Sequence, residues 1–287
     1  MGLALQLVTN GLALGALLAV VALGLALVFG VMGVVNFVHA EFITLGGYVT
    51  YFFVAKAGGP ALVGVVLAIV VGIALGFATQ RLVLSRVADR PPLDGLLLTY
   101  GLSVVGLGLI TFAFSGDYRS YPEVLSGGIH VAGVTVATED LLVVALCVLL
   151  VAAVTAFLRF TRTGSAMRAV AQHRDAAAAC GIDLRRMDAV AFGLGGGLGA
   201  AAGSVLSMSF VTTPELGRQW LLIGFVIVVL GGLGSLVGAI GGGVVVGLVQ
   251  VGVGYALDDT WARLVVYALL FVLLFVRPQG LAGGRTT

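Results

Sequence analysis

The uncharged stretch at residues 2–38, GLALQLVTNGLALGALLAVVALGLALVFGVMGVVNFV, decides the class of fold. Only 10% of the 287 residues are charged, whereas a soluble domain carries about 25%. We therefore predict an all-α, polytopic integral membrane protein with one membrane domain over residues 1–287. Further runs without a charged or histidine side chain cover residues 57–80, 95–116, 141–158, 189–214, 220–257 and 264–276.

Two of these runs are too long for a single straight crossing. An α-helix rises 1.5 Å per residue, so about 20 residues span a hydrocarbon core of about 30 Å. Residues 2–38 and 220–257 exceed this length, and each is expected to fold back or break. Residues 42–55 are apolar but short, which fits either a short helix completed by residues 36–41 or a re-entrant segment. We expect eight or nine transmembrane helices, with broken or re-entrant segments.

The arginines predict the sides of the membrane, because positive residues near helix ends favour the cytoplasm. Arginine is frequent in residues 81–90 and in residues 159–187, so both loops are expected to be cytoplasmic. Residues 117–140 include Glu123 and three other acidic residues, so they are expected outside, with a short element at residues 129–136. Arg277 and Arg285 predict a cytoplasmic C-terminus, which requires two crossings within residues 220–257. The side of the N-terminus stays open.

Glycine supplies 44 residues and is concentrated in the apolar runs. Small residues at a spacing of three or four let helix backbones approach closely, as expected from Gly199 to Gly203. The closely spaced Gly231, Gly232 and Gly234 allow two interpretations. They serve tight helix packing, or they mark a helix break that lines a cavity.

Polar residues interrupt the apolar pattern at two places. Asn36, His39 and Glu41 follow the first run, and polar groups at membrane depth are functional candidates because their burial is costly. In the alternative interpretation, His39 and Glu41 lie near the interface and face water or pair with each other. Residues 189–211 and the polar break at residues 212–219 faintly repeat this plan, as transporters with internal repeats do. Thr212 and Pro214 are expected either at an extracellular gate or in an ordinary turn.

Residues 161–183, TRTGSAMRAVAQHRDAAAACGID, form the longest expected cytoplasmic segment. Asp175 is a good helix N-cap, the four alanines after it are strong helix formers, and Gly181 suits the left-handed position after a helix end. The alanine face could lie in a groove of a partner protein, with Arg168 and Arg174 available for charge pairs. A solvated loop helix is the alternative.

The motif at residues 175–181, Asp-Ala-Ala-x-x-x-Gly, resembles the Glu-Ala-Ala-x-x-x-Gly coupling motif of ABC importer permeases, with Asp in place of Glu. More specifically, the chain resembles LivH-type permeases of branched-chain amino acid ABC transporters. Ala40 departs from the family, which usually has glycine there. The similar segments, spread over nearly the whole chain, are residues 10–11, 30–31, 36–39, 45–48, 162–171, 230–239 and 277–281.

The resemblance implies an assembly in the bacterial inner membrane. Its other members would be two ATPase subunits, a second homologous permease of the LivM type and an extracytoplasmic substrate-binding protein. Residues expected to couple the chain to the ATPase are Gly164, Arg168, Ala171, Arg174, Asp175, Ala176, Ala177 and Gly181. Residues expected at the substrate pathway or gate are Asn36, His39, Glu41, Tyr48, Thr212, Pro214, Gly231, Gly232 and Gly234.

We expect no enzymatic activity, cofactor or metal site in this chain. A Walker A motif needs a Gly-Lys pair, and the single lysine, Lys56, follows Val54 and Ala55. ATP and Mg²⁺ would therefore bind to partner subunits. No group of His, Cys, Asp and Glu has metal-ligand spacing, and the net charge of +2 is too small for nucleic acid to be the main partner.

The expected function is transport of branched-chain, hydrophobic amino acids by alternating access, powered by the separate ATPase subunits. Two alternatives stay open. The first is a permease for urea, amides or other amino acids, because related permeases resemble one another closely. The second is an ATP-independent channel or carrier for a small neutral solute. A carrier driven by protons or sodium usually needs a buried carboxylate, for which Glu41 is the one candidate.

Overall fold

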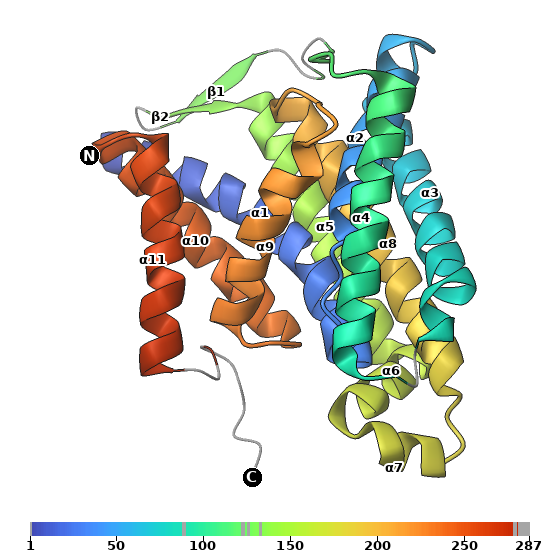
Figure 1. Ribbon diagram of the computed structural model, residues 1–287. Coiled ribbons are helices and arrows are strands. Elements are labelled where there is room, and N and C mark those ends of the chain that lie inside the picture. Colours follow the sequence, from blue (N-terminus) through green and yellow to red (C-terminus); the bar gives the residue numbers. More distant parts are fainter. Residues whose placement is uncertain are drawn as a thin grey trace.

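The computed structural model describes residues 2–87, 90–121, 124, 127–131, 134–277 and 280. These residues form a helical bundle with one short β-hairpin (Figure 1). The elements are α1 (Gly2–Met32), α2 (His39–Ala55), α3 (Ala61–Leu82), the 3-10 helix η1 (Leu84–Arg86), α4 (Pro92–Phe114), β1 (Gly128–Val131), β2 (Val134–Ala137), α5 (Thr138–Phe160), α6 (Arg162–Gln172), α7 (Arg174–Ala179), α8 (Leu184–Ser209), α9 (Leu216–Gly231), α10 (Leu236–Ala256) and α11 (Asp259–Val276).

The all-α membrane class is confirmed. Within the described residues, seven helices are long and apolar enough to cross a membrane, namely α1, α3, α4, α5, α8, α10 and α11. α2 has 17 residues and α9 has 16. The number of eight or nine crossings stays a prediction, because it depends on whether these two shorter helices also cross.

Both overlong runs are interrupted, as their length predicts. α1 ends at Met32, Gly33 adopts a left-handed φ of 68°, and the chain is not helical again until His39. α2 therefore includes the residues before Phe42, as expected for a short helix completed from that side. In the second run, Gly232 (φ 102°) and Gly234 (φ 80°) turn the chain from α9 into α10. Glycine favours these positions because a Cβ atom strains a backbone of positive φ.

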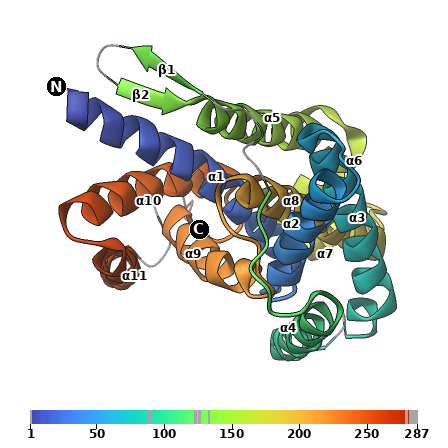
Figure 2. The same cartoon turned by 90° about the horizontal axis from the view of Figure 1, so that it is seen from above.

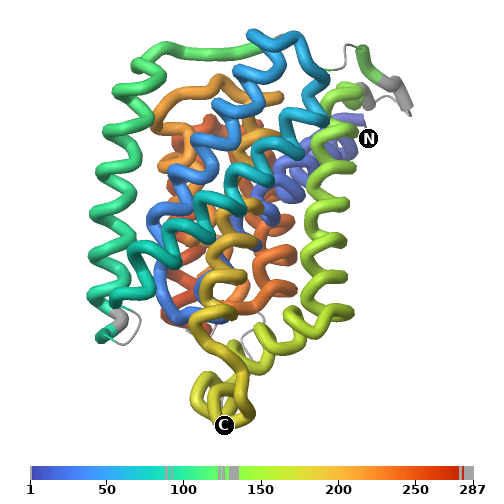
Figure 3. The backbone as a smooth tube through the Cα atoms, turned by 90° about the vertical axis from the view of Figure 1, so that its right-hand side faces the viewer, coloured from blue at the N-terminus to red at the C-terminus, as the bar shows by residue number. Residues whose placement is uncertain are grey.

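Each of the helices α1 to α4 runs opposite to its counterpart in the series α8 to α11 (Figure 1, Figure 3). α1 and α3 run toward the end of the bundle that carries α6 and α7, whereas α8 and α10 run away from it. α2 and α4 run away from that end, and α9 and α11 run toward it. The helix–break–helix plan of α1 and α2 is thus repeated, upside down, in α8 and α9, which is the arrangement of an inverted repeat.

Helix packing follows the same inverted repeat. The two most extensive pairings join α3 to α8 and α1 to α10, and each is the counterpart of the other. Likewise, α2 packs against α4 at one side, and α9 packs against α11 at the other. Figure 2 shows α4 and α11 at the periphery, on either side of α9. α5 joins the two halves and has no counterpart among the described helices.

The two main pairings rest on glycine. A Cβ atom on Gly196 of α8 would lie 2.5 Å from the backbone oxygen of Gly72 of α3. A Cβ atom on Gly243 of α10 would lie 2.7 Å from the backbone nitrogen of Ala19 of α1. At Gly203 of α8, a Cβ atom would clash with the backbone of α2. Tight packing therefore accounts for these glycines, because larger residues would hold the helices apart.

The two arginine-rich segments lie at one end of the bundle. Figure 3 shows α6, α7 and the connection between α3 and α4 together at that end. The N-terminal end of α1 and the β-hairpin lie at the opposite end, where a short element was expected. Glu123 and Arg285, on which part of the predicted sidedness depends, lie outside the described residues, as do residues 278–279 and 281 of the C-terminal motif.

The glycine contacts predict a contrast between two equally small substitutions. Gly196→Ala should lower the free energy of unfolding by about 1–3 kcal/mol, because the added methyl group forces α8 away from α3. Gly108→Ala on α4 faces open space among the described residues and should be neutral or stabilise by up to about 1 kcal/mol, through helix propensity. Thermal unfolding of the two purified variants in detergent tests the contrast, and equal transition temperatures would contradict it.

Candidate functional site at the helix break

The break between α1 and α2 buries a polar side chain. Asn36 is only 2% exposed, and neither Nδ2 nor Oδ1 has a hydrogen-bond partner among the described residues. An unpaired buried amide is costly, so buried amides are normally hydrogen-bonded within the protein. Asn36 is therefore a candidate ligand-binding side chain at the break, since a bound polar group would satisfy its amide.

Asn36 is among the residues around an apolar cavity of about 270 Å³ between α1, the break and α9, but both polar atoms of its amide are covered. Apolar walls beside an amide, which both donates and accepts hydrogen bonds, would suit a small amphiphilic molecule once the side chain turns toward the cavity. The aliphatic part of such a molecule would pack on the walls, and a polar group would bond to Asn36. The other lining residues are Leu25, Phe29, Val34, Val35, Phe37, Phe225, Val228, Val229 and Leu233.

His39 occupies the seam between α1, α2 and α8 rather than this cavity. Its side chain is fully buried, and Nε2 donates a hydrogen bond to the backbone oxygen of Val21 at 3.2 Å. Gly24 of α1 and Gly199 of α8 leave the space for the imidazole ring, because a Cβ atom at either position would contact ring carbon Cε1. His39 therefore holds the start of α2 against two helices.

Glu41 points in a third direction, toward α4. Its Oε1 accepts a hydrogen bond from Oγ of Ser103 at 2.9 Å, and Gly106 leaves room for the side chain. Glu41 and His39 are both buried, and no hydrogen bond or ion pair joins them in the part of the chain that the structure describes. The interpretation that the two residues face water or pair with each other is therefore wrong. His39 and Glu41 thus bond to different helices, whereas the amide of Asn36 has no partner among the described residues.

The predicted gate residues Tyr48 and Thr212 are connected through Phe114 and Arg119. The ring of Tyr48 stacks on Phe114 of α4, with 4.3 Å between ring centroids. Thr212 is buried, and its backbone exchanges two hydrogen bonds with Arg119, of 3.1 and 2.8 Å. Arg119 also donates from Nη2 to the backbone oxygen of Phe114 at 2.8 Å. One arginine thus joins the end of α4 to the break between α8 and α9.

Sequence reasoning missed two polar contacts at this second break. Oγ1 of Thr44 accepts a hydrogen bond from the backbone nitrogen of Gly217 at 3.0 Å and lies 3.4 Å from the backbone oxygen of Pro214. The hydroxyl groups of Tyr121 and Ser207 are 3.2 Å apart, and burial raises the pKa of Tyr121 to about 12, so its phenol stays neutral. A polar residue inside an apolar helix was the available signal for Thr44.

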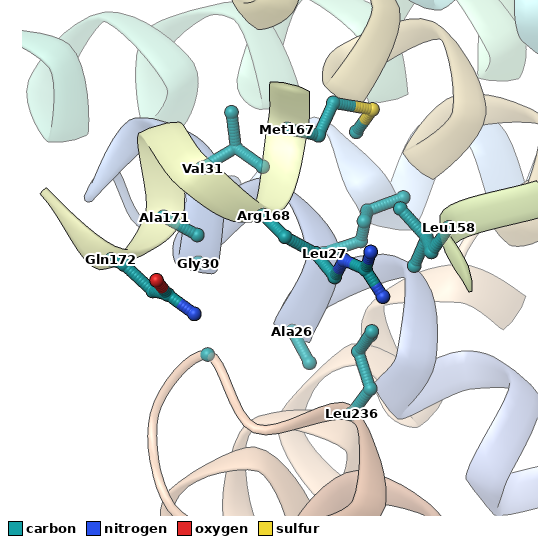
Figure 4. A pocket seen from close by; sticks show the side chains of 11 residues that line it. Ala26, Leu27, Gly30, Val31, Leu158, Met167, Arg168, Ala171, Gln172 and Leu236 are labelled. Carbon is teal, nitrogen blue, oxygen red and sulfur yellow. The ribbon is translucent and has the colours of Figure 1, made fainter. Parts of the chain in front are cut away.

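The expected coupling segment consists of two short helices. Oγ1 of Thr161 accepts a hydrogen bond from the backbone nitrogen of Gly164 at 2.9 Å and so caps α6. Gly164 is buried against the backbone of α5, where a Cβ atom would clash. Arg168 and Ala171 of α6 line a cavity of about 260 Å³ together with Gly30 and Gly234. Figure 4 shows Arg168, Ala171 and Gly30 around this cavity. Gly234 thus belongs to a helix break that lines a cavity.

The glycines around this turn also pack closely. A Cβ atom on Gly234 would lie 3.0 Å from Cα of Gly30, and one on Gly231 would clash with the backbone of Gly238. Both interpretations of this glycine cluster therefore hold, because the turn needs positive φ at Gly232 and Gly234 while Gly231 needs close packing.

α7 differs in two details from the prediction. The N-cap position is His173 rather than Asp175, so the helix begins two residues earlier than predicted and Asp175 lies in its first turn. Ala176 is exposed but Ala177 is buried, so the alanines do not form one free face. Gly181 has a φ of 83°, which confirms its left-handed position after the helix end.

Arg174 was expected to be available for a partner, and the structure shows that this is wrong. Its guanidinium group forms a bidentate ion pair with Asp188 of α8, with N–O distances of 2.9 and 2.6 Å. Nη1 also donates to the backbone oxygen of Val31 in α1 at 3.0 Å. Asp188 is 1% exposed, so its buried carboxylate requires this cation.

The unpartnered amide of Asn36 predicts a stability gain on its removal. Asn36→Leu should raise the free energy of unfolding by about 1–3 kcal/mol, because the buried amide is replaced by an apolar group of similar size. Asn10→Leu is the matched control, since Asn10 is exposed and should leave stability unchanged. Thermal unfolding in detergent measures both. A destabilised Asn36→Leu variant would show that the protein itself satisfies the amide.

Comparison with known proteins gives the family. Residues 7–274 match the family described as branched-chain amino acid transport system / permease component. The chain is 30% identical to the high-affinity branched-chain amino acid transport system permease protein LivH of Escherichia coli (strain K12), over 97% of this chain and 95% of that protein. It is 27% identical to the corresponding permease protein BraD of Pseudomonas aeruginosa, over the same shares. No solved structure matches. Because the family match spans most of the sequence, the chain belongs to the permease family of branched-chain amino acid transport systems.

Proposed function

We propose that this chain is the membrane permease of an ABC importer that moves branched-chain amino acids across the bacterial inner membrane by alternating access. The observation that carries the proposal is the buried, unpartnered amide of Asn36 beside an apolar cavity at the break between α1 and α2. Broken helices that line a cavity are where transporters bind their substrates. The names of the LivH and BraD relatives support the substrate class.

The chemistry of the cavity favours a hydrophobic amino acid over the alternatives. Valine, leucine and isoleucine combine a branched aliphatic side chain with a zwitterion that can bond to an amide. Urea and short amides are polar throughout and would leave the apolar walls without a matching group. A charged side chain would lose its hydration in the cavity without an opposite charge to replace it.

The orientation follows from the positions of the arginines. The end that carries α6 and α7, together with the connection between α3 and α4, would face the cytoplasm. The C-terminal end of α11 would then also be cytoplasmic, and the N-terminal end of α1 would face outward. In this orientation Arg119 and Thr212 lie at the outer end, where an extracytoplasmic binding protein would deliver the amino acid.

The remaining partners would supply the energy. Two ATPase subunits would bind ATP and Mg²⁺ and would contact α6 and α7, whose Arg168, Asp175 and Ala176 are exposed. A second, homologous permease would complete the membrane part of the assembly. The lack of a Gly-Lys pair in this chain supports that division of roles.

The substrate proposal predicts a loss of transport without a loss of folding. In liposomes that contain the complete assembly, Asn36→Leu should reduce ATP-driven leucine uptake by about 10–100-fold, because a hydrogen bond to a charged substrate group contributes about 1.5–3 kcal/mol. Asn10→Leu should transport normally. Normal uptake by Asn36→Leu would exclude Asn36 from the substrate site, and ATP-independent flux through the chain alone would favour the channel alternative.

The coupling proposal predicts that Arg168→Glu abolishes ATP-driven uptake while the chain still inserts and folds. Arg168 is exposed, and in the part of the chain that the structure describes its side chain bonds only to Ser165, at 3.3 Å, so charge reversal should disturb a partner contact rather than the fold. Arg86→Glu, at an exposed position of the same end, is the control. Uptake and membrane insertion are measured in parallel, and wild-type uptake by Arg168→Glu would remove α6 from the coupling surface.

A further inference from the structure

We propose that Arg174 transmits the movement of α6 and α7 to the helix break at residues 33–38, and so links the ATPase cycle to the cavity at Asn36. Arg174 would act through its neighbours as a positioning residue and would not touch the amino acid. The inference rests on the proposed function, because it assigns a mechanical role within that transport cycle. Its basis is that one side chain, at the start of α7, bonds to both α8 and α1.

Arg174 lies at the start of α7, and its guanidinium group bonds to the start of α8 and to the last turn of α1. The bidentate ion pair with Asp188 fixes the plane of the guanidinium group relative to α8. The hydrogen bond to the backbone oxygen of Val31 adds α1 to the same group. Arg174 is the first residue of α7, so a displacement of α7 moves the guanidinium group directly.

The contact with α1 is at the point where a helix has a free acceptor. The last four backbone oxygens of a helix lack partners within it, and Val31 belongs to that turn because α1 ends at Met32. A cation at a helix C-terminus is also favoured by the helix dipole. Arg174 therefore supplies both the hydrogen bond and the charge that the end of α1 needs. A lysine at position 174 could not hold the Asp188 carboxylate and the Val31 backbone oxygen in one fixed geometry, because its ammonium group lacks the planar fork of arginine.

The next residues along the chain form the break itself. Gly33 has left-handed backbone, and a Cβ atom placed on it would contact no described residue. Gly33 and Val34 also line a cavity of about 220 Å³ together with Arg174 and Asp188. There is space around this junction for the backbone to shift, whereas the rest of α1 is packed against α8 and α10. A displacement of Val31 would therefore shift residues 33–38, which include Asn36.

A residue that only stabilises the fold would make the same contacts, so the test must measure transport as well as stability. The complete assembly is reconstituted in liposomes with Arg174→Lys, which keeps the positive charge but loses the bidentate geometry. Leucine uptake, ATP hydrolysis and thermal unfolding are measured on the same preparations. Arg86→Lys is the matched control, since Arg86 is exposed at the same end of the bundle.

A second readout follows the break directly. In a background with Cys147→Ser and Cys180→Ser, a fluorophore is attached at Val34→Cys, and its emission is compared with and without trapped ATP. The expected result for Arg174→Lys is ATP hydrolysis within about twofold of wild type, uptake per ATP reduced about tenfold, and loss of most of the emission change. Arg86→Lys should behave as wild type in all three measurements.

Two outcomes would overturn the inference and are distinguishable from each other. If wild-type assembly takes up no leucine, the proposed function fails, and the inference fails with it. If wild type transports leucine while Arg174→Lys retains its uptake per ATP and its emission change, only the proposed role of Arg174 is wrong. This holds even if the variant unfolds at a lower temperature. Should Arg174→Lys fail to assemble, Asp188→Asn replaces it, with the same expected split between ATP hydrolysis and uptake.

Discussion

Close contact between helix backbones is the constraint on which this structure depends. Inside a membrane, burial of apolar surface does not hold helices together, because lipid tails are as apolar as the helices. Packing at short distance must do so, and it requires residues without a side chain at the crossing points. The glycines of α8 meet α3 and α2, and the glycines of α10 meet α1. These crossings form the central group of helices, and α4 and α11 are left at its periphery.

This tight central group also permits irregular backbone at membrane depth. A non-helical segment in contact with lipid would leave its amide groups without partners, whereas the same segment is tolerated inside the protein. Residues 33–38 lie between α1 and α9 and border a cavity, and the break before α9 is held by Thr44 of α2. The two breaks belong to opposite halves of the inverted repeat, and each contacts a helix of the other half: Phe37 meets Phe225 of α9, and Gly217 bonds to Thr44 of α2.

The polar groups of the chain are divided between holding the fold and serving transport. His39, Glu41 and Asp188 are buried, and each has a partner that fixes a helix junction. Asn36 differs, because its amide has no partner among the described residues. α6 and α7, with their exposed arginine and alanine residues, lie at the end of the bundle away from the β-hairpin.

The sequence by itself determined the all-α membrane class, the interruption of both overlong runs, the shared end of the two arginine-rich segments and the permease family. These features depend on local composition and helix length, which hydrocarbon thickness converts directly into structure. Only the tertiary structure separated Asn36, His39 and Glu41, and only it showed that Arg174 binds Asp188 and Val31 instead of facing a partner. The physical reason is that the direction of a side chain at a helix break is set by the elements packed around it. Those elements come from distant parts of the chain, so local sequence does not specify them.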